Sequence, residues 1–263
     1  MILLPMLLAA QVLAPPAQFL FRQSDGALAA PPAKLPAATV VAPTPKYRLD
    51  ASDTGTITTA GSTVSSWTST GSNTQSFTQG TAGQRPVSDG VGQVDFDGTD
   101  DFVSLGSQAS TANSHWFAVV TIDAVDTNGT GAACNSNDGV AGWPTGYGGL
   151  KLRESAGVTY LVGHNFDGAG DCAEVVVSKA TKILIEMKVD GSDVSVATNG
   201  GAFTSTPSGN TTVAGDSVMI GSGNAGGARF DGKVHEVWIY DNDLATADRN
   251  VVVTTLRNQW GFP

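Results

Sequence analysis

Short runs of β-branched and aromatic residues recur between clusters of turn-forming residues from about residue 46 onward, and this pattern constrains the fold most. About eleven such runs occur, at 64–67, 94–96, 102–105, 116–122, 149–153, 158–164, 173–177, 183–189, 194–197, 217–220 and 234–240. Asp190-Gly191 and Asn199-Gly200 are dipeptides typical of hairpin turns. Many strands joined by turns favour an all-β sandwich over an alternation of strands and helices.

The composition agrees with an all-β fold and argues against one class of function, nucleic-acid binding. The chain has 32 glycines, and charged residues make up 14%, against about 25% in typical soluble domains. Its net charge of −10 comes mainly from aspartate, because glutamate occurs only at 154, 174, 186 and 236. No local basic stripe offsets this acidity, which argues against nucleic-acid binding.

The first 45 residues differ from the rest. Eight of the 12 prolines precede residue 46, whereas Gly26 is the only glycine there among 32. The sequence therefore predicts an apolar anchor with a Pro/Ala-rich linker at 1–45 and a sandwich domain at 46–263.

Three interpretations of the apolar start remain open. A secretory signal would need a basic n-region, which the start lacks. A transmembrane helix needs about 18 or more apolar residues, and Pro5, Gln11 and the pair Pro15 and Pro16 interrupt this stretch. The third interpretation, which we favour, is an anchor that docks into a groove on a larger assembly.

One helix is expected near the end, in DNDLATADRNVVVTTLRNQWG. Thr246 is the expected N-cap, Val252, Leu256 and Trp260 form an apolar stripe, and Gly261 is the expected stop. The stripe favours packing of this helix against the sandwich.

The segment VDFDGTDDFVSL at 94–105 contains four aspartates around Gly98. Counted from Asp95, Gly98 falls at position 4 and Gly106 at position 12, whereas an EF-hand loop needs Gly at 6 and Glu at 12. The paired glutamates of sandwich glycosidases are also missing. We therefore interpret the segment as a hairpin, with Gly98 permitting the turn. Its tripeptide Phe-Asp-Gly recurs at 166–168 and 230–232.

The order of motifs resembles the laminin-G-like branch of the concanavalin A-like lectin/glucanase superfamily. The resemblance rests on YRLDASDTGTITTAGSTVSSWTSTGSN, VDFDGTDDFVSL and VMIGSGNAGGARFDGKVHEVWIYDNDLATADRNVVVTTLRNQWG, and it covers residues 47–261. It implies a two-sheet antiparallel jelly-roll sandwich with one short C-terminal helix and an extended N-terminal arm. It also implies that the 94–96 strand lies beside the 230–240 strand, and that five residues serve the core: Trp67, Phe96, Phe102, Val237 and Trp238. Many relatives bind glycans or proteins through loops at one rim, and some hold calcium there.

Two loops are the candidate ligand site. The long segment 126–149 and the neighbouring 164–172 combine aromatic rings with planar hydrogen-bonding groups, which a sugar site needs. The candidate ligand-binding residues are Trp143, Tyr147, Asn165 and Asp167. Asn137, Asp138 and Asp171 could act as weak calcium ligands. The alternative is a glycine-rich loop whose aromatics cover apolar surface.

Cys134 and Cys172 are the only cysteines, and their spacing does not suit zinc. The choice is one disulfide or two thiols. If 116–123, 149–154 and 158–164 form a meander, the loops that hold both cysteines leave from the same end, which makes a bridge geometrically feasible and implies an oxidising compartment. His115, His164 and His235 share no metal spacing and are expected to be sheet residues.

Together these observations favour a non-catalytic carbohydrate- or receptor-binding module on a virion or particle surface. We expect an extracellular location, attachment of residues 1–45 to a larger assembly, a cell-surface glycan as partner, and no cofactor apart from calcium. A homo-oligomer is compatible with this layout. The alternatives are a secreted or envelope-attached bacterial adhesin and a glycoside hydrolase of the same superfamily.

Overall fold

The structure is a computed structural model, which describes residues 41–108, 113–125, 138–142, 149–164, 172–191, 193–207, 216–222 and 229–262. The chain divides into one unit of residues 1–39 and a second of residues 40–263. The description below concerns the second unit.

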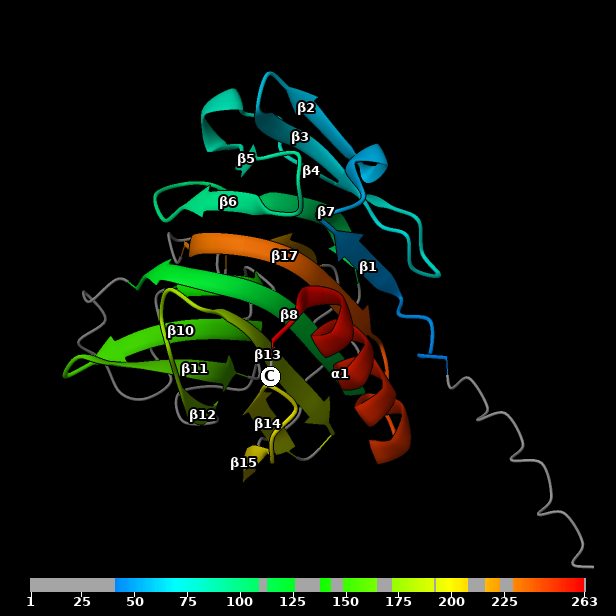
Figure 1. The fold of residues 1–263 in the computed structure, drawn as a ribbon, viewed down its shortest axis with the longest axis vertical. Helices are drawn as coiled ribbons and strands as arrows, with labels where there is room; N and C mark the ends of the chain where they lie inside the picture. Colours follow the sequence, from blue (N-terminus) through cyan, green and yellow to red (C-terminus); the bar gives the residue numbers. More distant parts are fainter. Residues whose placement is uncertain are drawn as a thin grey trace, which may run out of the picture. The chain divides into compact units, whose positions relative to one another are not determined.

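The described part consists mainly of strands (Figure 1). The strands are β1 (Tyr47–Asp50), β2 (Ile57–Ala60), β3 (Thr63–Thr68), β4 (Ser76–Thr78), β5 (Val87–Ser88), β6 (Val94–Asp97), β7 (Val103–Gln108), β8 (Asn113–Ala124), β9 (Asp138–Gly142), β10 (Gly149–Ser155), β11 (Val158–His164), β12 (Cys172–Val177), β13 (Lys182–Asp190), β14 (Asp193–Thr198), β15 (Thr204–Pro207), β16 (Asp216–Ile220) and β17 (Asp231–Tyr240). Two short 3-10 turns (Thr54–Thr56 and Ala82–Gln84) and the helix α1 (Thr246–Trp260) complete the described elements.

All the described strands are joined by antiparallel pairing into one network of 17 strands. One series runs β15-β14-β13-β8-β17, and the free edge of β17 pairs with both β1 and β6. A second series runs β7-β16-β9-β10-β11-β12. The short strands β5, β3 and β4 connect β6 to β7. The all-β antiparallel class is thus confirmed, but the described strands do not separate into the two sheets that the resemblance implied, because this strip of short strands bridges them.

The main core lies between the two series of strands, and strand β8 shows how the sequence produces it. Trp116, Ala118 and Val120 join the main core, whereas Phe117 and Val119 join a second cluster on the opposite face. Because successive side chains of a strand point to opposite faces, a strand covered on both sides reads as a continuous apolar run.

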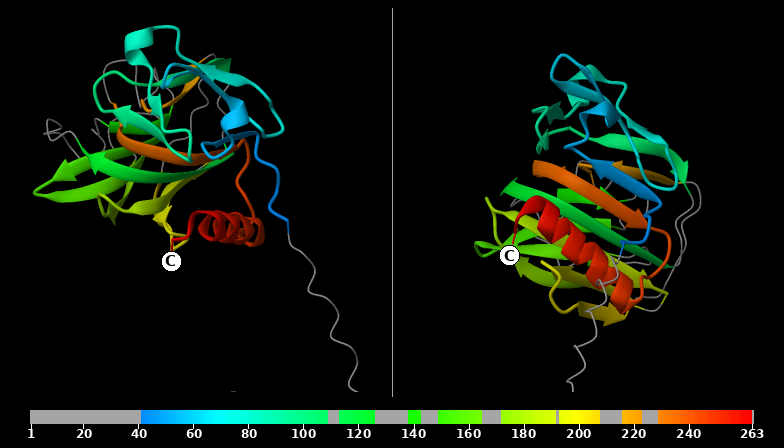
Figure 2. Two further views of the ribbon diagram at one scale, coloured as in Figure 1. Left: turned by 45° about the horizontal axis from the view of Figure 1, so that its top comes forward. Right: turned by 45° about the vertical axis from the view of Figure 1, so that its right-hand side comes forward.

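Helix α1 covers this second face (Figures 1 and 2). Its buried Val252 and Leu256 pack in the same cluster as Phe117 and Trp238, which confirms that the helix packs against the sandwich. Among the described residues, no helix is both long and apolar enough to cross a membrane.

The ends of α1 follow the sequence closely. The helix stops at Gly261, which is left-handed with φ 69° and donates its N–H to Arg257 O. The predicted N-cap, Thr246, is wrong by one residue, because the first helical hydrogen bond runs from Arg249 N–H to Ala245 O. Ala245 is therefore the N-cap, and its side chain has no oxygen with which to cap.

Two of the Phe-Asp-Gly copies lie side by side. Strands β6 and β17 pair so that Asp97 faces Asp231 and Phe96 faces Gly232, which confirms the adjacency implied by the resemblance. A Cβ at Gly232, where φ is 151°, would lie 2.2 Å from Thr121 O, so only glycine allows β17 to approach β8 here. The copy at 166–168 lies outside the described residues.

The segment around Gly98 is a turn, but the hairpin prediction is wrong. Strand β6 pairs with β5 and β17, whereas β7 pairs with β4 and β16. The turn therefore carries the chain from one series of strands to the other. Its aspartates hold the turn backbone: Asp101 Oδ2 accepts from Asp97 N–H at 3.1 Å, and Asp97 Oδ1 accepts from Thr99 N–H at 2.8 Å.

Four of the five core residues implied by the resemblance are confirmed, and the fifth, Phe102, belongs to neither core cluster. Trp67, Phe96 and Val237 belong to the main core, whereas Trp238 belongs to the helix-covered cluster. Phe102 is half-buried, with the Arg229 guanidinium 4.9 Å from its ring centre.

Candidate functional site

The predicted ligand loops leave the sheet at one end of strands β9 to β12. Gly149 pairs with both Gly142 and His164, and His164 pairs with Cys172. The predicted meander of 116–123, 149–154 and 158–164 is thus correct only for β10 and β11, which β9 and β12 extend on either side. Its first segment, 116–123, lies in β8, which pairs with β13 and β17 instead. The sequence segments that follow Gly142 and His164 therefore start from one end of the sheet.

Most of the predicted site residues lie outside the described residues. These are the four candidate ligand-binding residues and three of the loop residues expected to support them: Trp143, Tyr147, Asn165, Asp167, Cys134, Asn137 and Asp171. The backbone of Asp138 is described, and it pairs with Leu152 in strand β9. This strand was not predicted, because the interpretation of 126–149 as one irregular loop gave no weight to the short apolar pair Val140 and Ala141.

Cys172 is disulfide-bonded and buried at the start of β12. Cys134 is the one other cysteine in the sequence. The pairing of these two stays a prediction.

The face of β10 to β12 that is turned away from the core carries charged side chains beside apolar ones such as Val162 and Val176. Leu150, Leu152 and Leu161 point into the core, so the alternating Lys151 and Arg153 point the other way. Lys151 is only 1% exposed, and burial lowers its pKa to about 8.

Arg153 forms the centre of a charged group on the same face. Its guanidinium donates two hydrogen bonds to Glu174 and lies 4.2 Å from the ring centre of Tyr160. The Glu174 hydrogen bonds raise the pKa of Arg153. An arginine over an aromatic ring is stabilised by the cation–π interaction. Arg153 pairs with Tyr160 toward the Ser155–Val158 end of the two strands, away from the end at which the predicted loops start.

Each glutamate in the chain is paired with a cation. The four pairs are Glu154 with Lys179, Glu174 with Arg153, Glu186 with Arg249, and Glu236 with Arg48. A retaining glycosidase needs two carboxyl groups about 5 to 5.5 Å apart that face one cleft. The glutamates instead serve separate ion pairs.

Three aspartates of the turn between β6 and β7 come together. The carboxylate oxygens of Asp97, Asp100 and Asp101 lie within 4.8 Å of one another. Asp101 is 6% exposed, and burial raises its pKa to about 6, although the hydrogen bond from Asp97 N–H lowers it. Carboxylate oxygens suit calcium, so the cluster offers calcium ligands without the EF-hand register. The sequence excluded the EF-hand spacing, and it did not indicate that these three carboxylates come together.

All three histidines are sheet residues, as predicted, in β8, β11 and β17. His115 has a buried environment that the sequence did not indicate. Its ring stacks on Phe117 at 4.4 Å, and its Nε2 lies 3.5 Å from Glu186 Oε2. Burial lowers the pKa of His115, against the opposing effect of Glu186. Phe117 lies two residues along the same strand as His115. Glu186 comes from β13, so its proximity to His115 follows only from the pairing of β8 and β13.

Comparisons with known proteins bear on the fold. No protein-family model matches the sequence, and no curated protein sequence matches it. Among solved structures, a Trypanosoma rangeli sialidase in complex with 2,3-difluoro-KDN is 16% identical over 88% of this chain and 36% of its own, with a TM-score of 0.53. The same enzyme in complex with sialic acid is 16% identical over 81% of this chain and 33% of its own, with a TM-score of 0.51. The binding domain of botulinum neurotoxin serotype G is 10% identical over 81% of this chain and 51% of its own, with a TM-score of 0.51.

The chain thus spans 51% of the toxin domain and 36% of the sialidase. At these identities the similarity concerns the fold. It supports the antiparallel all-β fold and carries no assignment to a superfamily.

Proposed function

We propose that the protein is a non-catalytic carbohydrate-binding module of the laminin-G-like type, with its ligand site at the loop-bearing end of β9 to β12. The observation that carries the proposal is the register that aligns Gly149 with His164 and Cys172. Because of it, the loops with Trp143 and Tyr147 and with Asn165 and Asp167 start from one end of the sheet.

The chemistry of these loops suits a sugar. Aromatic rings stack on the apolar face of a pyranose, and amide and carboxylate groups bond its hydroxyls. The disulfide at Cys172 ties down the start of β12, which reduces the entropy that the adjacent loop would lose on binding. The register does not support a shared calcium site of Asn137, Asp138 and Asp171. Asp138 aligns through Leu152 and Leu161 with Val175, whereas Asp171 directly precedes Cys172 at the start of β12. The ion-paired state of the glutamates supports a role in binding rather than in hydrolysis.

We propose further that residues 1–45 attach the module to a virion or another particle, outside the cell, for attachment to a host glycan or receptor. Repetition on a particle would convert weak single-site binding into avidity. The alternative is a secreted or envelope-attached bacterial adhesin. N-terminal sequencing of native material separates the two: an intact Met1 supports assembly into a particle, and a chain that begins near Pro15 supports secretion.

A glycan array tests the binding function. Trp143→Ala combined with Tyr147→Ala should abolish the signals that the unmodified protein gives. Val91→Ala is the matched control, because Val91 is 84% exposed on the connection between β5 and β6. Array signals that survive the double variant would overturn the assignment of the site.

A second candidate function is glycoside hydrolysis, which the turn aspartates favour. Asp101 has a raised pKa beside Asp97, and two carboxyls in unlike environments can act as acid and base. Release of sugar from a polysaccharide panel, stopped by Asp97→Asn and by Asp101→Asn, would support it. No release by the unmodified protein would exclude it for that panel.

A further inference from the structure

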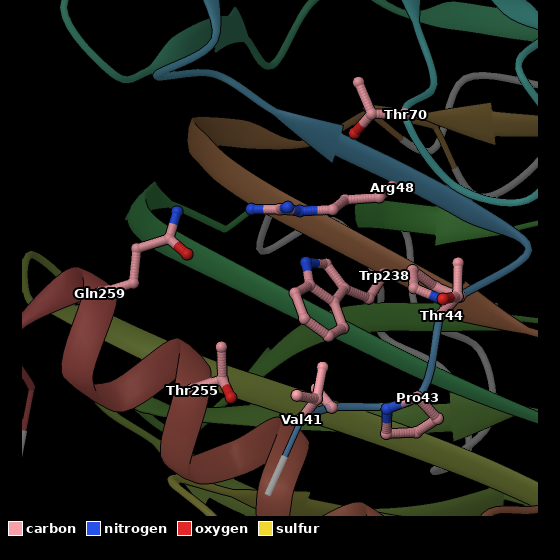
Figure 3. Close-up of a pocket in the computed structure, with 10 residues that line it drawn as sticks. Val41, Pro43, Thr44, Arg48, Thr70, Trp238, Thr255 and Gln259 are labelled. Atoms are coloured by element: carbon pink, nitrogen blue, oxygen red, sulfur yellow. The ribbon is translucent and has the colours of Figure 1, made fainter. Parts of the chain in front are cut away.

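A pocket of about 470 Å³ lies on the helix-covered face, between α1 and Trp238 (Figure 3). It is bounded by residues 41–45, by the second half of α1 and by Trp238 of β17. Pockets that bind small molecules commonly measure about 300 to 1,000 Å³. The size therefore suits a ligand of one or two rings.

Hydrogen bonds fix the wall formed by residues 41–45. Tyr240 Oη donates to Pro43 O at 2.9 Å, and Lys46 N–H donates to Ile239 O at 2.8 Å. The neighbouring wall at Thr70 approaches closely because of Gly71, where a Cβ would lie 2.5 Å from Lys46 O. The pocket is thus a built feature of the fold.

The polar side chains around Trp238 are also held in place. Arg48 lies 5.2 Å from the Trp238 ring centre, and its Nε donates to Glu236 Oε1 at 2.7 Å. Asp50 Oδ2 accepts from Arg48 Nη2 at 3.0 Å and from Gln259 Nε2 at 3.3 Å. Groups fixed before binding lose little entropy when a ligand arrives.

The charge balance argues against an anionic ligand. Among the described residues, Arg48 is the only charged one that lines the pocket, and it is paired with two carboxylates, Glu236 and Asp50. A ligand carboxylate or phosphate would compete with both of them.

The remaining hydrogen-bonding groups suit hydroxyls. Within the described part of the chain, nothing accepts a hydrogen bond from Arg48 Nη1, so it remains a donor. Gln259 uses its amide N–H on Asp50, which leaves Oε1 as an acceptor, and Thr255 donates its hydroxyl hydrogen to Val251 O, which leaves its oxygen lone pairs. A hydroxyl both donates and accepts, so it can satisfy groups of either kind.

We propose that this pocket binds a neutral, polyhydroxylated small molecule such as a pyranose. Its hydroxyls would bond Arg48, Gln259 and Thr255, and its C–H face would lie on Val41 and Pro43. The site shares no residue with the loop site at β9 to β12, so either proposal can fail without the other.

Thr255→Leu is the test, because it removes one acceptor and fills the pocket. Thr254→Leu is its matched control: Thr254 is the next residue on α1, is exposed, does not line the pocket, and makes the same type of hydrogen bond, to Asn250 O at 2.7 Å. Binding of neutral methyl α-glucoside, α-galactoside and α-mannoside to the full chain is measured by saturation-transfer NMR and calorimetry, with glucuronate as the anionic probe.

At least one neutral glycoside should bind, and Thr255→Leu should weaken it about tenfold or more. Thr254→Leu and the Trp143→Ala/Tyr147→Ala double variant should leave that affinity unchanged. The proposal is overturned if no neutral glycoside binds, if glucuronate binds better, or if Thr254→Leu and Thr255→Leu act alike. Loss of binding in the double variant alone would support the loop site and reject this pocket.

Discussion

Removal of the Arg249 guanidinium should destabilise the protein strongly. Glu186 is fully buried beneath the start of α1, and Arg249 bonds both of its carboxylate oxygens. The guanidinium also donates to Gly201 O at 2.7 Å and lies 4.4 Å from the Phe203 ring centre. Arg249→Met keeps an apolar stem on Phe203 but leaves the Glu186 charge without its partner.

Loss of one partner of a buried ion pair costs about 3 to 5 kcal/mol. The variant also loses the hydrogen bond that Arg249 donates to Gly201 O. We therefore expect Arg249→Met to lower the free energy of unfolding by about 3 to 5 kcal/mol.

Urea unfolding at pH 7 followed by tryptophan fluorescence is the assay. Arg257→Met is the control, because Arg257 is half-buried on the same helix and makes no ion pair with any described residue. Its effect should stay below about 0.5 kcal/mol. Glu186→Gln added to Arg249→Met should recover most of the loss. Equal losses in the two arginine variants, or a double variant that is no more stable than Arg249→Met alone, would refute the reasoning.

Three further predictions concern the fold and the turn. Gly232→Ala should lower the free energy of unfolding in urea by more than about 2 kcal/mol, because its Cβ would collide with Thr121 O. Gly80→Ala, with open space around it, should be neutral. Similar losses in the two variants would contradict this. Asp101→Asn should stabilise the protein at pH 7 and not at pH 4. The raised pKa of Asp101 means that the unmodified protein loses stability as the pH rises from about 4 to about 6. If Asp101→Asn instead destabilises the protein when calcium is present, the turn is a metal site. Cys172→Ser should cost about 2 to 5 kcal/mol, checked by thermal unfolding; unchanged thermal unfolding under reduction would reject a stabilising disulfide.

Much of the fold could be predicted because its central strands carry a strong local pattern. Strand β11 has the predicted bounds, and β8 and β13 extend only slightly beyond theirs. Strands such as β2 and β15 were missed because they are short, polar and largely exposed, so no apolar run marks them. Their pairing comes from the hairpins they join, which the sequence does not specify.

The functional sites were harder to predict because they combine distant segments. Arg48 and Trp238 are neighbours only because β1 pairs with β17 in a register that aligns them. The sequence offered one partial indication, the alternation in KVHEVWIY, which puts Glu236 and Trp238 on one face. The gathering of Asp97, Asp100 and Asp101 was local but depended on a turn that is not a hairpin.

The affinity of the full chain for its best array glycan tests the central claim most directly. Calorimetry should show that Trp143→Ala/Tyr147→Ala weakens binding about a hundredfold, since a stacked aromatic contributes about 1.4 kcal/mol and each such step is tenfold. Val91→Ala should leave the affinity unchanged. An affinity that the double variant retains, or the absence of any glycan that binds the unmodified protein, would contradict a carbohydrate site at the end of β9 to β12.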